Sequence, residues 1–208
     1  MEKIMTGNSV CLTGRVVSEP VFNHKTYGEA FYMIILGIFR KSGYEDRVRL
    51  LVSDHLMGGR SPVKGEILRI SGQIRTYNKE TEGRSKLEIT VFVREMEYCR
   101  ESESEYENRV ILEGYLCKQP VRRTSPLGRE LCDLMIAVNR MYNKSDYIPA
   151  IAWGRNAIYA DTLHIGEKVA VDGRLQSREY RKYTEGGELI TKTAYEVSIA
   201  RIETISEW

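Results

Sequence analysis

The chain repeats itself at a spacing of about one hundred residues, and this repeat constrains its fold more than any other feature. A shift of one hundred positions superimposes identical residues: Asn8 on Asn108, Gly14 on Gly114, Pro20 on Pro120, Gly28 on Gly128 and Arg40 on Arg140. One extra residue in the second half then brings Gly65 onto Gly166 and Gly72 onto Gly173. Such self-similarity predicts two copies of one domain joined in tandem.

The predicted boundary is the acidic segment 101–107, in which four of seven residues are glutamate. We therefore expect a first domain over residues 1–100, an acidic linker over 101–107 and a second domain over 108–208. The formal net charge of the whole chain is only +2. This value excludes a strongly basic, histone-like protein, but it leaves room for a local basic groove.

The second copy gives the clearer pattern of elements. Its apolar alternation and turn residues predict strands over 110–116, 131–139, 147–153, 168–180 and 189–202, a turn over 122–129, a loop over 140–146, a helix over 156–164 and a hairpin loop over 181–187. Pro149 places the third strand at an edge or a bulge. Five strands with a helix between the third and fourth predict an all-β oligonucleotide-binding (OB) fold, a small and partly open barrel.

The first copy is predicted to be a reduced version of the same barrel. Its helix position, residues 55–62, contains Gly58, Gly59 and Pro62. Because glycine and proline both disfavour helix, we expect no proper helix there.

Several classes of protein are disfavoured by what the chain lacks. Its three histidines are scattered and no catalytic motif is present, so we do not expect an enzyme or a cofactor. The four cysteines show no metal-ligand spacing and are expected to be small apolar residues in a reducing cytosol. No apolar run is long enough for a membrane helix and no leader segment is evident, so we expect a cytoplasmic, nucleoid-associated protein.

At this point the chain resembles bacterial single-stranded DNA-binding proteins. The resemblance is carried by residues 108–116 (NRVILEGYL), 136–140 (IAVNR), 151–157 (IAWGRNA) and 166–180 (GEKVAVDGRLQSREY). It covers residues 108–203 in the same order, whereas for residues 8–97 it rests mainly on the internal repeat. It implies bases stacked on aromatic side chains and phosphates held by basic ones.

The resemblance implies Tyr142, Tyr147, Trp153 and Tyr180 as the stacking residues. Strand alternation independently puts Tyr147 and Trp153 on one face of their strand, and it puts Arg178 and Tyr180 on one face of theirs. Two loops add further candidates for nucleic-acid binding: Arg140, Lys144, Lys182 and Tyr183. The alternatives are that the tyrosines are half-buried sheet residues and that Trp153 belongs to the core.

The first copy departs from this pattern. Opposite Tyr142, Tyr147 and Trp153 it has Ser42, Arg47 and Ser53. Tyr77 and Tyr44 are its candidates for stacking, and Arg40 and Arg47 are among its candidates for phosphate contact. Two roles stay open for this copy: weak binding through phosphates, or service as the built-in partner of the second barrel.

The sequence therefore predicts sequence-tolerant binding of single-stranded DNA, in replication, recombination or repair. The resemblance also implies four barrels in the assembly, and hence a homodimer of this two-barrel chain. Replication or repair proteins are possible partners, and Glu207 with Trp208 forms a short acidic-aromatic ending. The alternatives are a primosome-type protein-interaction module with weak or no DNA binding, and a binder of RNA.

Overall fold

The computed structural model describes residues 7–81, 84–100, 105–125, 127–183 and 186–205. The first half contains β1 (Asn8–Val16), β2 (Val21–Thr26), β3 (Glu29–Phe39), β4 (Glu45–Ser53), α1 (Asp54–Met57), β5 (Ile67–Thr81) and β6 (Arg84–Cys99). The second half contains β7 (Glu107–Leu116), β8 (Val121–Thr124), β9 (Glu130–Asn139), the 3₁₀ turn η2 (Met141–Asn143), β10 (Ser145–Trp153), α2 (Arg155–Asp161), β11 (Lys168–Tyr183) and β12 (Leu189–Thr204). The order of elements thus repeats, as the sequence predicts.

Each half closes into a five-stranded barrel. In the first, β1 pairs with both β5 and β3, and β4 runs parallel to β6. In the second, β7 pairs with β11 and β9, and β10 runs parallel to β12. The short strands β2 and β8 are additions at the two ends of the sheet, outside the barrels. The structure confirms two tandem OB-fold barrels.

Repeated glycines lie where the barrel strands approach most closely. A Cβ atom at Gly14 would lie 2.6 Å from the carbonyl oxygen of Gly37, and one at Gly114 would lie 2.5 Å from that of Ala137. These are the points where β1 meets β3 and β7 meets β9, so only glycine fits. Gly72 and Gly173 lie opposite equivalent β-bulges, because the pairing with β5 skips Arg94 of β6 and the pairing with β11 skips Ala200 of β12. Each bulge bends its strand.

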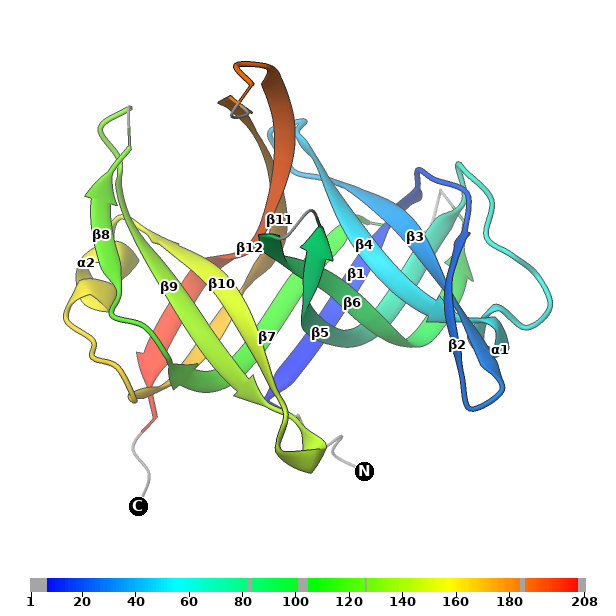
Figure 1. The fold of residues 1–208 in the computed structure, drawn as a ribbon, viewed down its shortest axis with the longest axis horizontal. Helices are drawn as coiled ribbons and strands as arrows, with labels where there is room; N and C mark the ends of the chain where they lie inside the picture. The colour runs from blue at the N-terminus through cyan, green and yellow to red at the C-terminus, as the bar shows by residue number, and fades with distance from the viewer. Residues whose placement is uncertain (1–6, 82–83, 101–104, 126, 184–185, 206–208) are drawn as a thin grey trace.

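The two barrels are joined by the antiparallel pairing of β1 with β7, at the middle of a twelve-stranded sheet (Figure 1). Val10 lies opposite Val110, its own equivalent in the repeat. The joint is therefore self-complementary, like the interface of a twofold dimer, although both halves belong to one chain. In Figure 1, β2 and α1 lie at one end of the molecule, and β8 and α2 lie at the other.

A buried carboxylate on β10 fastens the second barrel to β5 of the first. Asp146 is completely buried. Its Oδ1 accepts a hydrogen bond of 2.6 Å from the backbone N–H of Thr76. Arg140 also donates to Oδ1, and Arg75 lies 3.3 Å from Oδ2. The hydroxyl of Thr76 in turn accepts a 2.9 Å bond from the backbone N–H of Tyr147.

The equivalent carboxylate on β4 makes the reciprocal contact. Asp46 is also completely buried and accepts a 2.9 Å hydrogen bond from the backbone N–H of Ser177 on β11. Arg40 donates two bonds of 2.6 Å to this carboxylate. The backbone N–H of Arg47 donates to the hydroxyl of Ser177. The two aspartates, one in each repeat, thus fix how the barrels lie against each other.

Several local predictions need correction. Residues 122–129 are not simply a turn, because β8 pairs with β9 up to Thr124. Residues 181–183 continue β11 instead of forming a loop. Pro149 lies on an internal strand whose pairing with β9 is continuous. This is tolerated because β12 pairs only with Ala150 and Ile151.

The first barrel does contain a helical turn, contrary to expectation. Ser53 caps α1 by accepting a hydrogen bond from the backbone N–H of Leu56. Gly58, in the left-handed conformation, ends it after four residues. The glycines therefore shorten this helix and do not abolish it.

Residues 101–104 of the predicted linker lie outside the described residues, as does Trp208. Glu105 and Tyr106 precede β7, which begins at Glu107. Within the described segments, neither α1 nor α2 has the length and apolar character needed to cross a membrane.

We predict that Asp146→Ala destabilises the fold by about 3 kcal/mol, because it leaves two partly buried guanidinium groups and a backbone N–H without their acceptor. Urea unfolding of the full chain measures this loss. Asp133→Ala is the matched control, since its pair with Arg123 is largely exposed and should be worth less than about 1 kcal/mol. Equal losses in the two variants would contradict the role assigned to Asp146.

Candidate nucleic-acid interface

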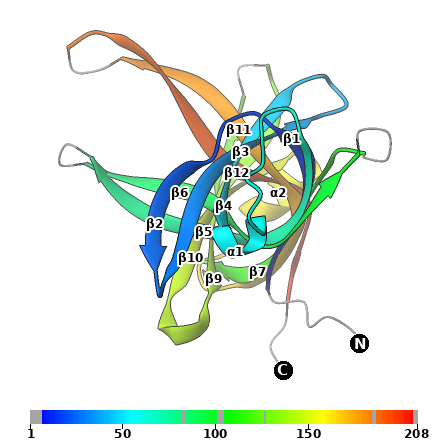
Figure 2. The same ribbon diagram turned by 90° about the vertical axis from the view of Figure 1, so that its right-hand side faces the viewer.

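Both barrels contribute to one face of the molecule. The long hairpins β5–β6 and β11–β12 project to the same side (Figure 2). The loop between β3 and β4 reaches β11 of the other barrel, where the Tyr44 hydroxyl donates a 3.2 Å bond to the carbonyl of Ser177. Likewise Arg140, after β9, donates to the carbonyl of Thr76 on β5. Each hairpin is therefore flanked by a loop of the opposite barrel.

The larger groove on this face has a volume of about 800 Å³, and we name it the Trp153 groove. It is lined by Trp153, Arg174, Ser177 and Arg178 of the second barrel together with Arg40 and Tyr44 of the first. The Arg40 guanidinium lies 4.6 Å from the centre of the Tyr44 ring. An aromatic ring at a groove edge among arginines is an arrangement suited to a nucleotide chain.

Trp153 ends β10 and is 37% exposed. It does not belong to the cluster of buried apolar side chains that forms the core of the described residues. Its ring lines the groove, and this position favours contact with a ligand over the alternative core role.

The other aromatic candidates on the second barrel are also accessible. Tyr147 is 50% exposed and, like Trp153, lies on β10. Tyr180 is half-buried on β11, with the guanidinium of Arg178 6.0 Å from its ring centre. The Arg178 side chain also lies 3.7 Å from the carboxylate of Glu196. Tyr183 is exposed near the end of the same strand.

Two predicted site residues can be placed by backbone alone. Tyr142 belongs to η2 and Lys182 to β11, and their side chains lie outside the described part of the structure.

The predicted basic residues differ in how far they are already engaged. Arg40 and Arg140 are held by the buried aspartates, and the hydrogen bond to Asp46 raises the pKa of Arg40. Arg47 is exposed and bonded to Glu45, which raises its pKa. Lys144 is exposed and forms no ion pair with any described residue. Lys144 and Arg178 are therefore more available for phosphate than Arg40 and Arg140.

A second groove has a volume of about 660 Å³, and we name it the Tyr77 groove. The sequence predicted Tyr77, Arg140 and Lys144 as binding residues, but it did not indicate Phe92 and Arg94 or bring these side chains together. The groove is lined by Arg75, Tyr77, Phe92 and Arg94 of the first barrel with Arg140 and Lys144 of the second. The internal repeat could have located it, because the segment 176–178 of the Trp153 groove falls on 75–77. The two grooves are thus equivalents across the joint of the barrels.

The described residues offer little for other chemistry. They include no cluster of histidine, cysteine, aspartate and glutamate that could hold a metal ion. The four cysteines are free thiols, and burial raises the pKa of Cys132 to about 11.

Comparison with known proteins agrees with the fold. The model of the single-strand binding protein family matches residues 107–205. Single-stranded DNA-binding protein 1 of Clostridium acetobutylicum is 32% identical over 108 residues, which are 48% of this chain and 97% of that protein. Single-stranded DNA-binding protein A of Bacillus subtilis is 39% identical over 80 residues, 35% of this chain and 46% of that protein. The chain thus spans about half the length of several curated relatives that it matches.

The likeness to a solved structure extends over both barrels. The wild-type single-stranded DNA binding protein from Thermus aquaticus aligns with a TM-score of 0.74 and 25% identity. The alignment covers 97% of this chain and 94% of that one, so the two chains share the tandem arrangement.

Proposed function

The chain belongs to the single-strand binding protein family, and from this premise we propose that it binds single-stranded DNA with little sequence preference. The family model and the relatives that carry the name of single-stranded DNA-binding protein support this function. We further propose that the protein protects single strands in replication, recombination or repair, as a cytoplasmic, nucleoid-associated protein.

The observation that carries the proposal is the Trp153 groove. Every base has a flat π face, and every nucleotide carries one negative charge, so a sequence-tolerant site needs aromatic rings beside cations. Trp153 supplies the ring, while Arg174 and Arg178 supply charge from β11. Tyr147 and Tyr180 extend the set of accessible rings along β10 and β11.

A titration with dT, rU and duplex oligomers at fixed salt tests the proposal. We expect dT to bind more tightly than a duplex, since a duplex keeps its base faces stacked and hidden from the groove. Preference for rU would favour the RNA-binding alternative. Absence of binding to every oligomer would favour the protein-interaction module and overturn the proposal.

We predict that dT quenches tryptophan emission through stacking on Trp153. The quench should disappear in Trp153→Phe and survive in Trp208→Phe. Trp153→Ala should weaken dT binding by about 1–3 kcal/mol. Its melting temperature should stay near that of the wild type, because the side chain is 37% exposed. A collapsed fold in Trp153→Ala, with no quench in the wild type, would instead make Trp153 a core residue.

We predict a different signature for the basic residues. Removing one cation that binds a phosphate, as in Arg178→Gln, should reduce the slope of log affinity against log salt by about 0.7, because fewer counterions are released. Trp153→Ala should leave that slope nearly unchanged, since stacking releases no counterion. Identical slopes in the wild type and Arg178→Gln would remove Arg178 from the phosphate path.

We also propose a homodimer with four barrels, because one twofold step doubles a two-barrel chain. Light scattering at micromolar concentration should then give about twice the chain mass of 24.0 kDa. A single species at the chain mass would contradict the dimer without affecting the proposed DNA binding.

A further inference from the structure

The Tyr77 groove has a larger excess of positive charge than the Trp153 groove. Four cationic side chains line it: Arg75, Arg94, Arg140 and Lys144. No carboxylate is among its described lining residues, and the buried Asp146 is shared between Arg75 and Arg140. Arg94 and Lys144 form no ion pair with any described residue. By contrast, Glu130 and Glu179 line the Trp153 groove.

The positive charges of the Tyr77 groove are close enough to one another to change the pKa of Arg75. Burial lowers the pKa of this guanidinium, and Arg140 and Arg94 lower it further, while Asp146 opposes them. Guanidinium groups keep their charge at neutral pH, so three of them converge on one groove. A bound anion would relieve this repulsion.

Aromatic rings lie beside these charges. Tyr77 on β5 is 44% exposed. The guanidinium of Arg94 lies 4.9 Å from the ring centre of the half-buried Phe92 on β6. Behind Phe92, at 5.9 Å, is the buried ring of Phe31, on which the exposed His24 stacks at 5.0 Å. The groove therefore has both components that a single strand requires.

These aromatic positions differ from those of the second barrel. Phe92 pairs with Gln73 beside the bulge of β6, and Ser198 pairs with Arg174 at the equivalent place beside the bulge of β12. Tyr77 corresponds in turn to Arg178 by the repeat. The first barrel thus lacks rings where the second has them and has rings where the second lacks them.

We propose that the Tyr77 groove is a second single-strand binding site, in which bases stack on Tyr77 and Phe92 and phosphates lie against Arg94 and Lys144. This inference rests on the proposed function and gives the first barrel an active part in it. Because Lys144 comes from the second barrel, the site is complete only when both barrels are joined.

The test uses the full chain and a labelled dT oligomer long enough to reach both grooves. Tyr77→Ala should weaken binding about tenfold, within the range of one base–aromatic stack. Phe92→Leu, which keeps an apolar side chain against Phe31, should act in the same direction. Arg94→Gln should lower the salt slope by about 0.7. The Trp153 quench should persist in all three variants.

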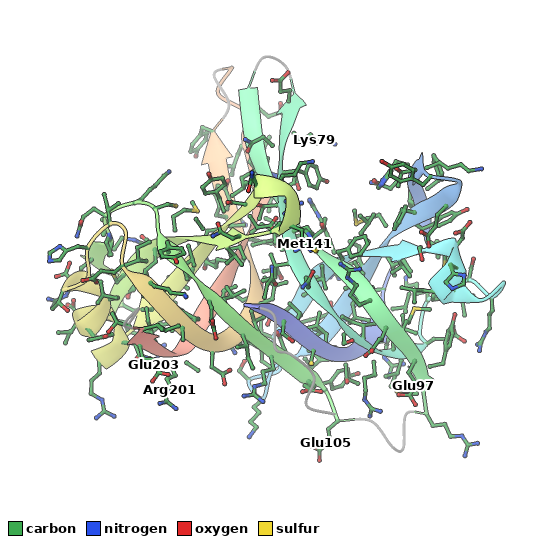
Figure 3. All side chains as sticks on the ribbon, turned by 90° about the horizontal axis from the view of Figure 1, so that it is seen from below. Lys79, Glu97, Glu105, Met141, Arg201 and Glu203 are labelled. Carbon is green, nitrogen blue, oxygen red and sulfur yellow. The ribbon has the colours of Figure 1, made fainter. Side chains whose placement is uncertain are left out.

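The matched controls are residues that do not line the groove. Tyr27→Ala removes a fully exposed tyrosine at the tip of the β2–β3 hairpin. Arg201→Gln removes an arginine on the side opposite Lys79 and Met141 (Figure 3). Neither control should change affinity or salt slope.

The outcomes separate this inference from the proposed function. If the wild type binds dT and Trp153→Ala weakens it, but Tyr77→Ala and Arg94→Gln bind like the controls, the second site is wrong and the function stands. If the wild type binds no dT, both fail. A melting scan of each variant distinguishes weakened binding from unfolding, and Arg94, exposed on β6, gives the least disruptive substitution.

Discussion

The architecture depends on the antiparallel pairing of β1 with β7, in which Val10 lies opposite Val110. A strand that pairs with its own repeat makes a self-complementary joint, so a contact on one side can recur on the other where the two repeats share the residue. Asp46 and Asp146 follow this rule, each accepting a backbone N–H of the opposite barrel. A buried carboxylate is costly unless fully hydrogen-bonded, so these contacts tolerate little change in how the barrels lie.

This joint makes the candidate binding face a surface shared by both barrels. Each groove combines the hairpin strand of one barrel with the loop of the other, as Tyr44 against Ser177 and Arg140 against Thr76 illustrate. Neither barrel alone would carry a complete groove. The arginines nearest the joint, Arg40 and Arg140, hold the aspartates and frame the grooves, while Arg94, Lys144 and Arg178 have side chains more available to a ligand.

The two halves keep the same order of strands and differ in the side chains that line the two grooves. The glycines that allow barrel closure, Gly14 and Gly114, are retained in both because a Cβ atom would strike a backbone carbonyl. No such constraint acts on the groove surface. The position of Trp153 in the second barrel is therefore occupied by Ser53 in the first, and the position of Phe92 in the first barrel is occupied by Ser198 in the second. Both barrels keep the same fold.

The sequence by itself determined the duplication, through the internal repeat, and the OB fold. It also determined that Tyr147 and Trp153 share one face of their strand, because strand alternation acts over a few residues, but their exposure came from the structure. It could not reveal that Asp46 and Asp146 fasten the barrels, since each meets a partner on a strand distant in the chain. Nor could it indicate that Phe92 and Arg94 share a groove with Lys144. Only the tertiary structure decided these points, because they depend on the register of β1 against β7, which sets which side chains of the two barrels meet.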